Sequence, residues 1–228
     1  MTSKKNVTII GSGISGISSA YYLQNDFDVT LIESQHRLGG HTHTVLTHDK
    51  TAVDTGFIVF NLKNYPFFTQ FLSDLDVAYQ NSDMSFGYYD ALSSFWYSSD
   101  FPWGVFSQKK HLLSPKFWSF LREINRFNTQ VCHDLDAHTM GDLSLDDYLQ
   151  SIGCSHFFKQ SYVLPMGAAI WSCPLSCILS FPAHSFFSFW KNHALLTLGK
   201  RPTWKTVKGG SQRYIDAFKA QFNGRILT

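Results

Sequence analysis

The sequence is poor in charged residues and carries almost no net charge. Asp, Glu, Lys and Arg together make up 16% of the 228 residues, and 19 basic against 17 acidic side chains leave a formal net charge of +2. We find no basic run, no low-complexity segment and no internal repeat, so the charge pattern gives no reason to expect a nucleic-acid partner. The length suits one large domain or two small ones.

Cysteine is also scarce. The four cysteines are scattered along the chain, which argues against a disulfide framework and favours reduced thiols. Cys173 and Cys177 lie near His184, but this spacing fits no zinc site and Pro174 intervenes. We therefore expect no metal site.

The sequence also lacks a signal peptide and an uninterrupted hydrophobic span. Residues 1–6 are polar and lead directly into the first expected strand, so we expect a cytoplasmic protein. From Gln160 to Trp190 there is no Asp, Glu, Lys or Arg, but three prolines and several serines interrupt the segment. These interruptions argue against a transmembrane helix.

The first forty residues, by contrast, contain a dinucleotide-binding pattern. An apolar strand over residues 7–10 leads into a Gly-x-Gly-x-x-Gly turn at residues 11–16, and this turn opens a helix. A second apolar strand over residues 29–32 ends at Glu33. This order and spacing indicate a βαβ unit that binds an adenine dinucleotide.

Each part of the pattern has its own task in binding a pyrophosphate. Gly11 permits a tight turn, Gly13 lets the backbone approach the phosphates, and Gly16 allows the helix to lie close to the sheet. The start of the helix offers unpaired N–H groups and a positive dipole end. Glu33 is placed to hold the adenosine ribose, and its charge disfavours the 2′-phosphate of NADP. The predicted cofactor-binding residues of this part are Gly11, Ser12, Gly13, Ile14, Ser15, Gly16 and Glu33.

A second glycine pair favours FAD over NAD. The segment Arg37-Leu38-Gly39-Gly40-His41-Thr42 follows Glu33 almost directly. Its glycines offer a second stretch of backbone that can approach the pyrophosphate, and Arg37 adds positive charge.

These segments, together with Val53-Asp54-Thr55-Gly56-Phe57, resemble the flavin-containing amine oxidase superfamily. A closer resemblance is to the bacterial amine-oxidase-like FAD proteins associated with cyclopropane fatty acid synthases. It extends over nearly the whole chain. The segments that carry it are residues 41–45, 54–61, 64–66, 82–86, 167–172 and 209–211.

The resemblance implies an α/β fold with a Rossmann-like FAD-binding domain of the GR2 type. This domain would comprise residues 1–65 and 205–228, with an inserted α+β substrate domain over residues 66–204. The family continues beyond the strand in which this chain stops, so the C-terminal part of the FAD-binding domain is expected to be missing. The resemblance also assigns residues to the phosphate and ribityl side of FAD (Arg37, Gly39, Gly40, His41 and Thr42) and to its flavin end (Gly56 and Phe57).

Hydrophobic spacing predicts the elements of the inserted region and of the return to the first domain. Ser114-Pro115 is a typical helix start, and Ser144 with Asp147 begins another helix that stops at Gly153. The expected helices cover residues 67–75, 115–135, 144–153 and 212–222, and the expected strands cover residues 84–88 and 95–97.

From these features we predict an FAD-dependent oxidoreductase that transfers a hydride from an apolar or lipid-related substrate to flavin. Flavin sites often need no strong acid or base, so no catalytic residue is assigned, although Lys205 is a candidate for a position near the flavin. The many aromatic residues of the inserted region are interpreted as core and interface. An apolar substrate channel, with contact to a membrane surface, is the alternative interpretation.

Other functions stay open at this point. One is a flavin-binding module without turnover that serves a partner such as a lipid-modifying enzyme. Another is a truncated, inactive product. An NAD-dependent dehydrogenase is a weaker alternative, and the segment from Arg37 to Thr42 argues against it.

Overall fold

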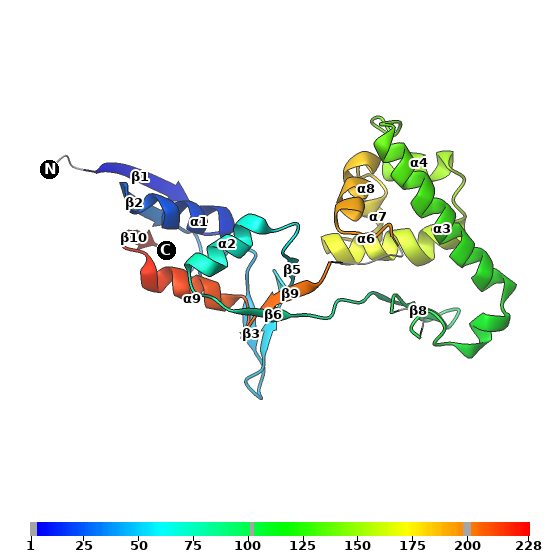
Figure 1. Cartoon of the computed structure of the whole chain (residues 1–228), viewed down its shortest axis with the longest axis horizontal. Helices are drawn as coiled ribbons and strands as arrows, with labels where there is room; N and C mark the ends of the chain where they lie inside the picture. The colour runs from blue at the N-terminus through cyan, green and yellow to red at the C-terminus, as the bar shows by residue number, and fades with distance from the viewer. Residues whose placement is uncertain (1–3, 101–102, 198–201) are drawn as a thin grey trace. The chain divides into compact units, whose positions relative to one another are not determined.

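The computed structural model describes residues 4–100, 103–197 and 202–228 and has a mixed α/β fold. The chain forms two compact units (Figure 1). The first comprises residues 1–83 and 202–228, and the second comprises residues 84–201.

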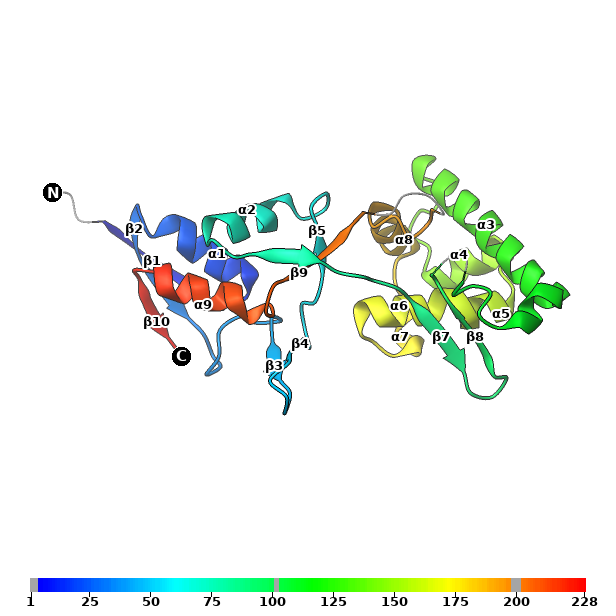
Figure 2. The same cartoon turned by 60° about the horizontal axis from the view of Figure 1, so that its bottom comes forward.

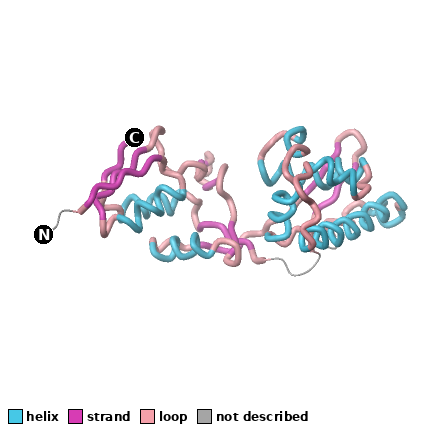
Figure 3. Tube along the Cα trace, turned by 90° about the horizontal axis from the view of Figure 1, so that it is seen from above, coloured by secondary structure: helices cyan, strands magenta, loops and turns pink. Residues whose placement is uncertain are grey.

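A three-stranded parallel sheet forms the centre of the first unit. Its order is β1 (Lys5–Ile10), β2 (Phe27–Ile32) and β10 (Arg225–Leu227). Helix α1 (Ile14–Leu23) connects β1 to β2, and α9 (Gln212–Gln221) leads into β10. The helices of this unit lie on one side of the strands (Figure 3).

The sheet is apolar on the side that faces the helices. Along β2, Val29 and Leu31 are buried, whereas Asp28, the second residue of the strand, is exposed. Alternation of this kind is expected when only one face of a sheet is covered. The fully or nearly fully buried core of the unit includes Ile17, Ala20, Val29, Leu31, Leu72, Tyr214, Ile215 and Phe218.

Two smaller sheets complete the first unit. A hairpin pairs β3 (Thr44–Leu46) with β4 (Ala52–Asp54). An antiparallel sheet joins β5 (Phe60–Asn61), β9 (Trp204–Val207) and β6 (Tyr79–Asn81) in the order β5-β9-β6. The single helix between β5 and β6 is α2 (Pro66–Asp74).

The first unit extends further along the chain than the predicted FAD-binding domain. The sequence places the domain boundary after residue 65, whereas the compact unit ends at residue 83. The reason is packing: Phe71, Leu72 and Leu75 of the α2 region lie in the same core as Val207, and β6 pairs with β9. The second boundary lies at residue 201, against residue 204 in the prediction.

The second unit is mainly helical and carries one β-hairpin (Figure 2). The hairpin pairs β7 (Gly87–Asp90) with β8 (Phe95–Ser98). The strand predicted over residues 84–88 thus begins only at Gly87. The helices are η1 (Lys109–Leu113), α3 (Pro115–Asp136), α4 (Leu145–Ser151), α5 (His156–Phe158), the π-helical η2 (Lys159–Val163), α6 (Leu164–Trp171), α7 (Leu175–Ile178) and α8 (Ala183–Asn192).

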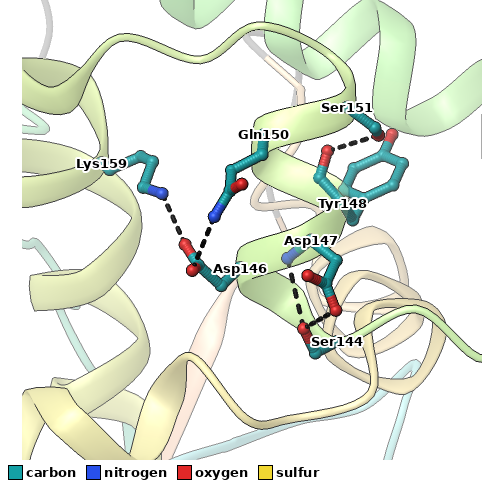
Figure 4. Close-up of polar contacts among 7 residues, drawn as sticks. All are labelled: Ser144, Asp146, Asp147, Tyr148, Gln150, Ser151 and Lys159. Atoms are coloured by element: carbon teal, nitrogen blue, oxygen red, sulfur yellow. Dashed lines mark hydrogen bonds and ion pairs between the residues drawn. The ribbon is translucent and has the colours of Figure 1, made fainter.

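The predicted helix starts of this unit are confirmed. The Ser114 hydroxyl accepts a hydrogen bond from the Phe117 amide at 3.2 Å, at the start of α3. At the start of α4, the Ser144 hydroxyl accepts from the Asp147 amide at 3.2 Å and donates to the Asp147 carboxylate at 2.6 Å (Figure 4). Such caps satisfy amides that have no partner inside the helix.

Aromatic side chains fill the core of the second unit, as expected from the sequence. The largest fully buried side chains include Phe117, Phe127, Phe158, Phe186, Phe187 and Trp190. Where η2 departs from α-helical hydrogen bonding, the Tyr97 hydroxyl donates to the Ser161 carbonyl oxygen at 2.8 Å. Among the helices that the structure describes, none is both long and apolar enough to cross a membrane.

Candidate functional site

The loop between β1 and α1 has free space next to the backbone of its first two glycines. Gly11 has φ +93°, and its amide donates to the Ile32 carbonyl oxygen at 2.7 Å, so the loop is anchored to β2. A Cβ atom added at Gly11 or Gly13 would meet no atom within 4 Å. Backbone without side chains is therefore accessible on this side of the loop.

The first turn of α1 is uncapped. Gly13 precedes the helix and supplies no side chain. The amides of Ile14, Ser15 and Gly16 have no acceptor within the part of the chain that the structure describes. No acidic side chain lies in this first turn. Together the unpaired N–H groups and the positive end of the helix dipole form a site that favours an anion.

Gly16 holds the helix against the loop. A Cβ atom at this position would lie 1.9 Å from the carbonyl oxygen of Gly11, which is a backbone atom and cannot turn aside. The absence of a side chain is therefore required for α1 to start where it does.

Glu33 at the end of β2 is fixed next to the same loop. Its carboxylate accepts hydrogen bonds from the Ser12 amide at 2.9 Å and from the Ser12 hydroxyl at 2.5 Å. The Gln35 amide at 3.0 Å and the Ser34 hydroxyl at 3.2 Å donate to its other oxygen. The bonds from Ser12, followed by those from Gln35 and Ser34, lower the pKa of Glu33 to about 2, so the side chain is ionised at neutral pH.

The second glycine pair lies directly against the first glycine turn. The Gly39 amide donates to the Ser12 carbonyl oxygen at 3.0 Å. Gly39 and Gly40 have φ values of +116° and +57°, and a Cβ at Gly40 would lie 2.9 Å from the Cα atom of Gly13. The backbone of the first glycine turn thus meets the backbone of the second glycine pair at Gly13.

Arg37 braces this second turn. Its two terminal guanidinium nitrogens donate to the carbonyl oxygens of Thr42 at 2.8 Å and Gly40 at 2.9 Å. The side chain therefore places a permanent positive charge beside the loop while fixing the loop's shape.

The other predicted site residues have different surroundings. Gly56 lies against the His41 backbone, because a Cβ at Gly56 would be 1.8 Å from the His41 carbonyl oxygen. Thr42 is buried, and its hydroxyl forms a hydrogen bond with the Tyr214 hydroxyl. Phe57 packs edge-on against Phe68, within the aromatic core of the first unit. The structure thus gathers residues 11–16, 33, 37, 39 and 40, whereas the side chains of Thr42 and Phe57 point into packing contacts.

Sequence reasoning gave no role to Asp54, which caps α9 from a distant strand. The Asp54 carboxylate accepts from the Ser211 amide at 2.9 Å and from the Ser211 hydroxyl at 2.7 Å. The Thr44 hydroxyl accepts from the Gln212 amide at 2.9 Å and donates to Asp54. The start of α9 is therefore closed by side chains of the β3–β4 hairpin. In the sequence, only the acid in the Val53–Phe57 segment and the Gly-Gly-Ser before the last helix could have indicated this cap.

Lys205 is occupied by contacts within its own sheet. It lies on β9, where its ammonium group donates to the Asn81 side-chain oxygen and stands 5.9 Å from the centre of the Tyr79 ring. The described residues contain no group of three or more His, Cys, Asp or Glu side chains that could hold a metal ion.

Comparison with known proteins finds a Rossmann-like family model near the start of the chain and short matches to amine oxidases. Residues 9–75 match the family of NAD(P)-binding Rossmann-like domains. The chain is 56% identical over 43 residues to "Polyamine oxidase 5" of Oryza sativa subsp. japonica, covering 18% of this chain and 9% of that protein. It is 42% identical over 52 residues to "Amine oxidase [flavin-containing] A" of Canis lupus familiaris, covering 22% and 10%.

Solved structures of putrescine oxidase share the fold over the whole chain. One such structure, a triple mutant, aligns with a TM-score of 0.68 at 17% sequence identity and covers 100% of this chain. The wild-type protein bound to putrescine aligns with a TM-score of 0.70 at 15% identity. In both, this chain spans 51% of the other chain's length. The predicted α/β fold with a Rossmann-like domain is confirmed.

Proposed function

We propose that this chain belongs to the flavin-containing amine oxidase superfamily and binds FAD as the dinucleotide-binding part of an oxidoreductase. The observation that carries the proposal is the meeting of two glycine turns at the uncapped start of α1, beside an ionised Glu33. Each feature fits one part of an adenine dinucleotide. Short sequence matches to amine oxidases support the same assignment.

The pyrophosphate of FAD fits the space above Gly11 and Gly13. The amides of Ile14, Ser15 and Gly16 would donate to its oxygens, and Arg37 would add positive charge from the second turn.

The adenosine ribose fits beside Glu33. An ionised carboxylate accepts hydrogen bonds from the two ribose hydroxyls, and the Ser12 bonds hold it in place for this task. The Ser34 hydroxyl, at 3.2 Å, makes the longest of the present bonds and is the donor that a ribose hydroxyl would displace. The same negative charge disfavours the 2′-phosphate of NADP.

When bound, FAD supplies the capacity to accept a hydride equivalent from a substrate C–H bond. This chain's own residues bind and orient the cofactor through its phosphate and ribose groups. The resemblance found in the sequence favours an apolar or lipid-related substrate, whereas the aromatic side chains of the second unit are packed in its core. The names of the relatives, polyamine oxidase and putrescine oxidase, make an amine the second candidate class.

The proposal has three further parts, which concern the location of the protein, its partner and the extent of its FAD-binding domain. They are a cytoplasmic location, a functional link to a lipid-modifying enzyme such as a cyclopropane fatty acid synthase, and an incomplete FAD-binding domain that needs further chain for turnover. The chain spans about half the length of the putrescine oxidase chains that it matches, which supports the third part.

The proposal is tested by the visible spectrum of the purified chain after incubation with FAD and removal of free cofactor. We expect a retained flavin absorption band, and about tenfold weaker FAD binding in Glu33→Gln because the ribose loses a charged acceptor. Asp28→Asn is the matched control, since Asp28 is an exposed acid on the same strand. Retention of NAD in place of FAD, or equal binding by both variants, would contradict the assignment.

A further inference from the structure

A group of exposed basic and apolar side chains lies on the second unit, which contains none of the residues assigned to FAD. It comprises Lys109, Lys110, Leu112, Leu113, Lys116 and Trp118, which we call the basic–apolar patch. Leu113 is 88% exposed, Leu112 51% and Trp118 43%, and the three lysines are also exposed. Large apolar side chains at this level of exposure, gathered within ten residues of sequence, indicate a binding surface.

The local fold fixes these side chains at the surface. In η1 the buried residue is His111, whose ring stacks on Phe117 with centroids 4.0 Å apart, so the following Leu112 and Leu113 turn outward. The Trp118 indole N–H donates to the Leu112 carbonyl oxygen at 3.0 Å, which ties the start of α3 to the end of η1. The exposed leucines therefore belong to an ordered structure and do not sit on a loose end.

The charge of this region has one sign. Between residues 103 and 122 the sequence contains Lys109, Lys110, Lys116 and Arg122 and no Asp or Glu. Glu123, the first acid after this stretch, accepts hydrogen bonds from the amide and hydroxyl of Ser155. Four cations and no acid make this stretch of sequence positive, although the whole chain has a formal net charge of only +2.

A hollow opens beside the patch. It has a volume of about 360 Å³ and is lined by the lysines 110 and 116, by Leu113 and by the aromatic rings of Phe95, Phe117 and Phe157. The Lys116 ammonium group stands 4.1 Å from the centre of the Phe157 ring. The hollow thus combines an aromatic wall with a cationic rim.

We propose that the basic–apolar patch binds the surface of membranes that contain anionic lipids. Lysines around exposed apolar side chains match the two layers of such a surface, with phosphate and carboxylate groups outside and hydrocarbon beneath. Trp118 has the amphipathic character that suits the boundary between these layers. Leu112 and Leu113 favour a lipid over a single-stranded nucleic acid, because bases stack on aromatic rings and not on aliphatic side chains.

Vesicle sedimentation tests the proposal with the full chain. We expect the protein to sediment with vesicles of phosphatidylcholine and phosphatidylserine, to stay in solution with phosphatidylcholine alone, and to dissociate as salt concentration rises. The double variant Lys109→Glu/Lys110→Glu should bind at least about tenfold more weakly. Leu113→Ser should bind about fivefold more weakly, because it removes an inserting side chain.

Matched variants outside the patch control for general effects of charge and hydrophobicity. Lys208→Glu/Lys219→Glu carries the same charge change on exposed residues of the first unit, and Leu175→Ser removes another exposed leucine of the second unit. Both should bind vesicles as the unchanged chain does. Equal weakening by controls and patch variants, or equal binding to neutral vesicles, would overturn the proposal.

Two further measurements separate lipid from other partners of the same surface. Light scattering after size exclusion would reveal a dimer that Leu113→Ser dissociates, and fluorescence anisotropy would reveal an oligonucleotide that the lysine variant releases. Either result without vesicle binding would overturn the lipid proposal. The test requires no FAD, so its outcome is independent of the proposed function.

Discussion

Helices α1 and α9 both have ten residues and pack in the same unit, but they begin in opposite ways. At α9 the first amides donate hydrogen bonds to side chains of the β3–β4 hairpin. The acceptors are the Asp54 carboxylate and the Thr44 hydroxyl. At α1 the first amides donate to no acceptor among the described residues, and the glycines before them carry no side chain. Since helix starts must be satisfied by protein, water or ligand, the difference separates a structural start from a binding one.

The largest effect is expected where the open start depends on close packing. In Gly16→Ala the new Cβ would fall 1.9 Å from the Gly11 carbonyl oxygen, so the loop and helix must separate. We expect a loss of about 3 kcal/mol in the free energy of unfolding and a loss of FAD binding. Urea denaturation and FAD titration measure the two effects. Gly13→Ala, whose Cβ meets no atom, should unfold as the unchanged chain does.

The next largest effect concerns the closed start. Asp54→Asn keeps the size of the side chain but removes the negative charge that accepts hydrogen bonds from the Ser211 amide and hydroxyl. We expect the free energy of unfolding, from urea denaturation, to fall by about 2 kcal/mol. A fall no greater than that of Asp28→Asn, on an exposed part of β2, would show that α9 does not need this cap.

A smaller effect is expected at an ordinary cap in the second unit. Ser144→Ala removes the hydroxyl that accepts from the Asp147 amide at the start of α4. The free energy of unfolding should fall by about 1 kcal/mol. FAD affinity should stay unchanged, because no predicted cofactor residue lies in this unit. A loss of FAD affinity in Ser144→Ala would contradict this and would show that the second unit contributes to cofactor binding.

The smallest effect concerns the pH range in which Glu33 stays ionised. Hydrogen bonds from Ser12 lower the pKa of Glu33 from 4.5 to about 2. A carboxyl group with a lowered pKa in the folded state stabilises that state above its ordinary pKa, and this contribution is lost as pH falls toward 2. We expect Glu33 to stay largely ionised between pH 5 and pH 3, where a carboxyl group with the ordinary pKa of 4.5 would titrate. A carboxyl NMR signal of Glu33 with a midpoint near its ordinary value would contradict this.

The open start could be predicted from the sequence, and the closed start could not. The Gly11–Gly16 turn, Glu33 and the caps at Ser114 and Ser144 depend on residues close together in the chain, where spacing fixes geometry. Asp54 and Ser211 are 157 residues apart, and no local pattern pairs them. The hydrogen bond between the Thr42 and Tyr214 hydroxyls likewise joins distant residues, and the assignment of Thr42 to the cofactor stays a prediction.

The extent of the first unit shows the same limit. Helical spacing predicted a helix near α2, but not that Phe71 and Leu72 share a core with Tyr214 at the other end of the chain. In the second unit, the π-helical η2 accepts a hydrogen bond at the Ser161 carbonyl oxygen from the Tyr97 hydroxyl, 64 residues away in the sequence. Local rules find the elements, and packing between distant segments decides which unit each element joins.

One measurement tests the central claim that the open start of α1 receives the FAD pyrophosphate. FAD affinity should be compared in the unchanged chain, Gly13→Val and Gly87→Val. At both glycines an added Cβ meets no atom within 4 Å, so both variants should fold. The account predicts at least about a hundredfold loss of affinity in Gly13→Val, since a side chain there blocks backbone approach, and no loss in Gly87→Val. Equal affinity in all three proteins would contradict it.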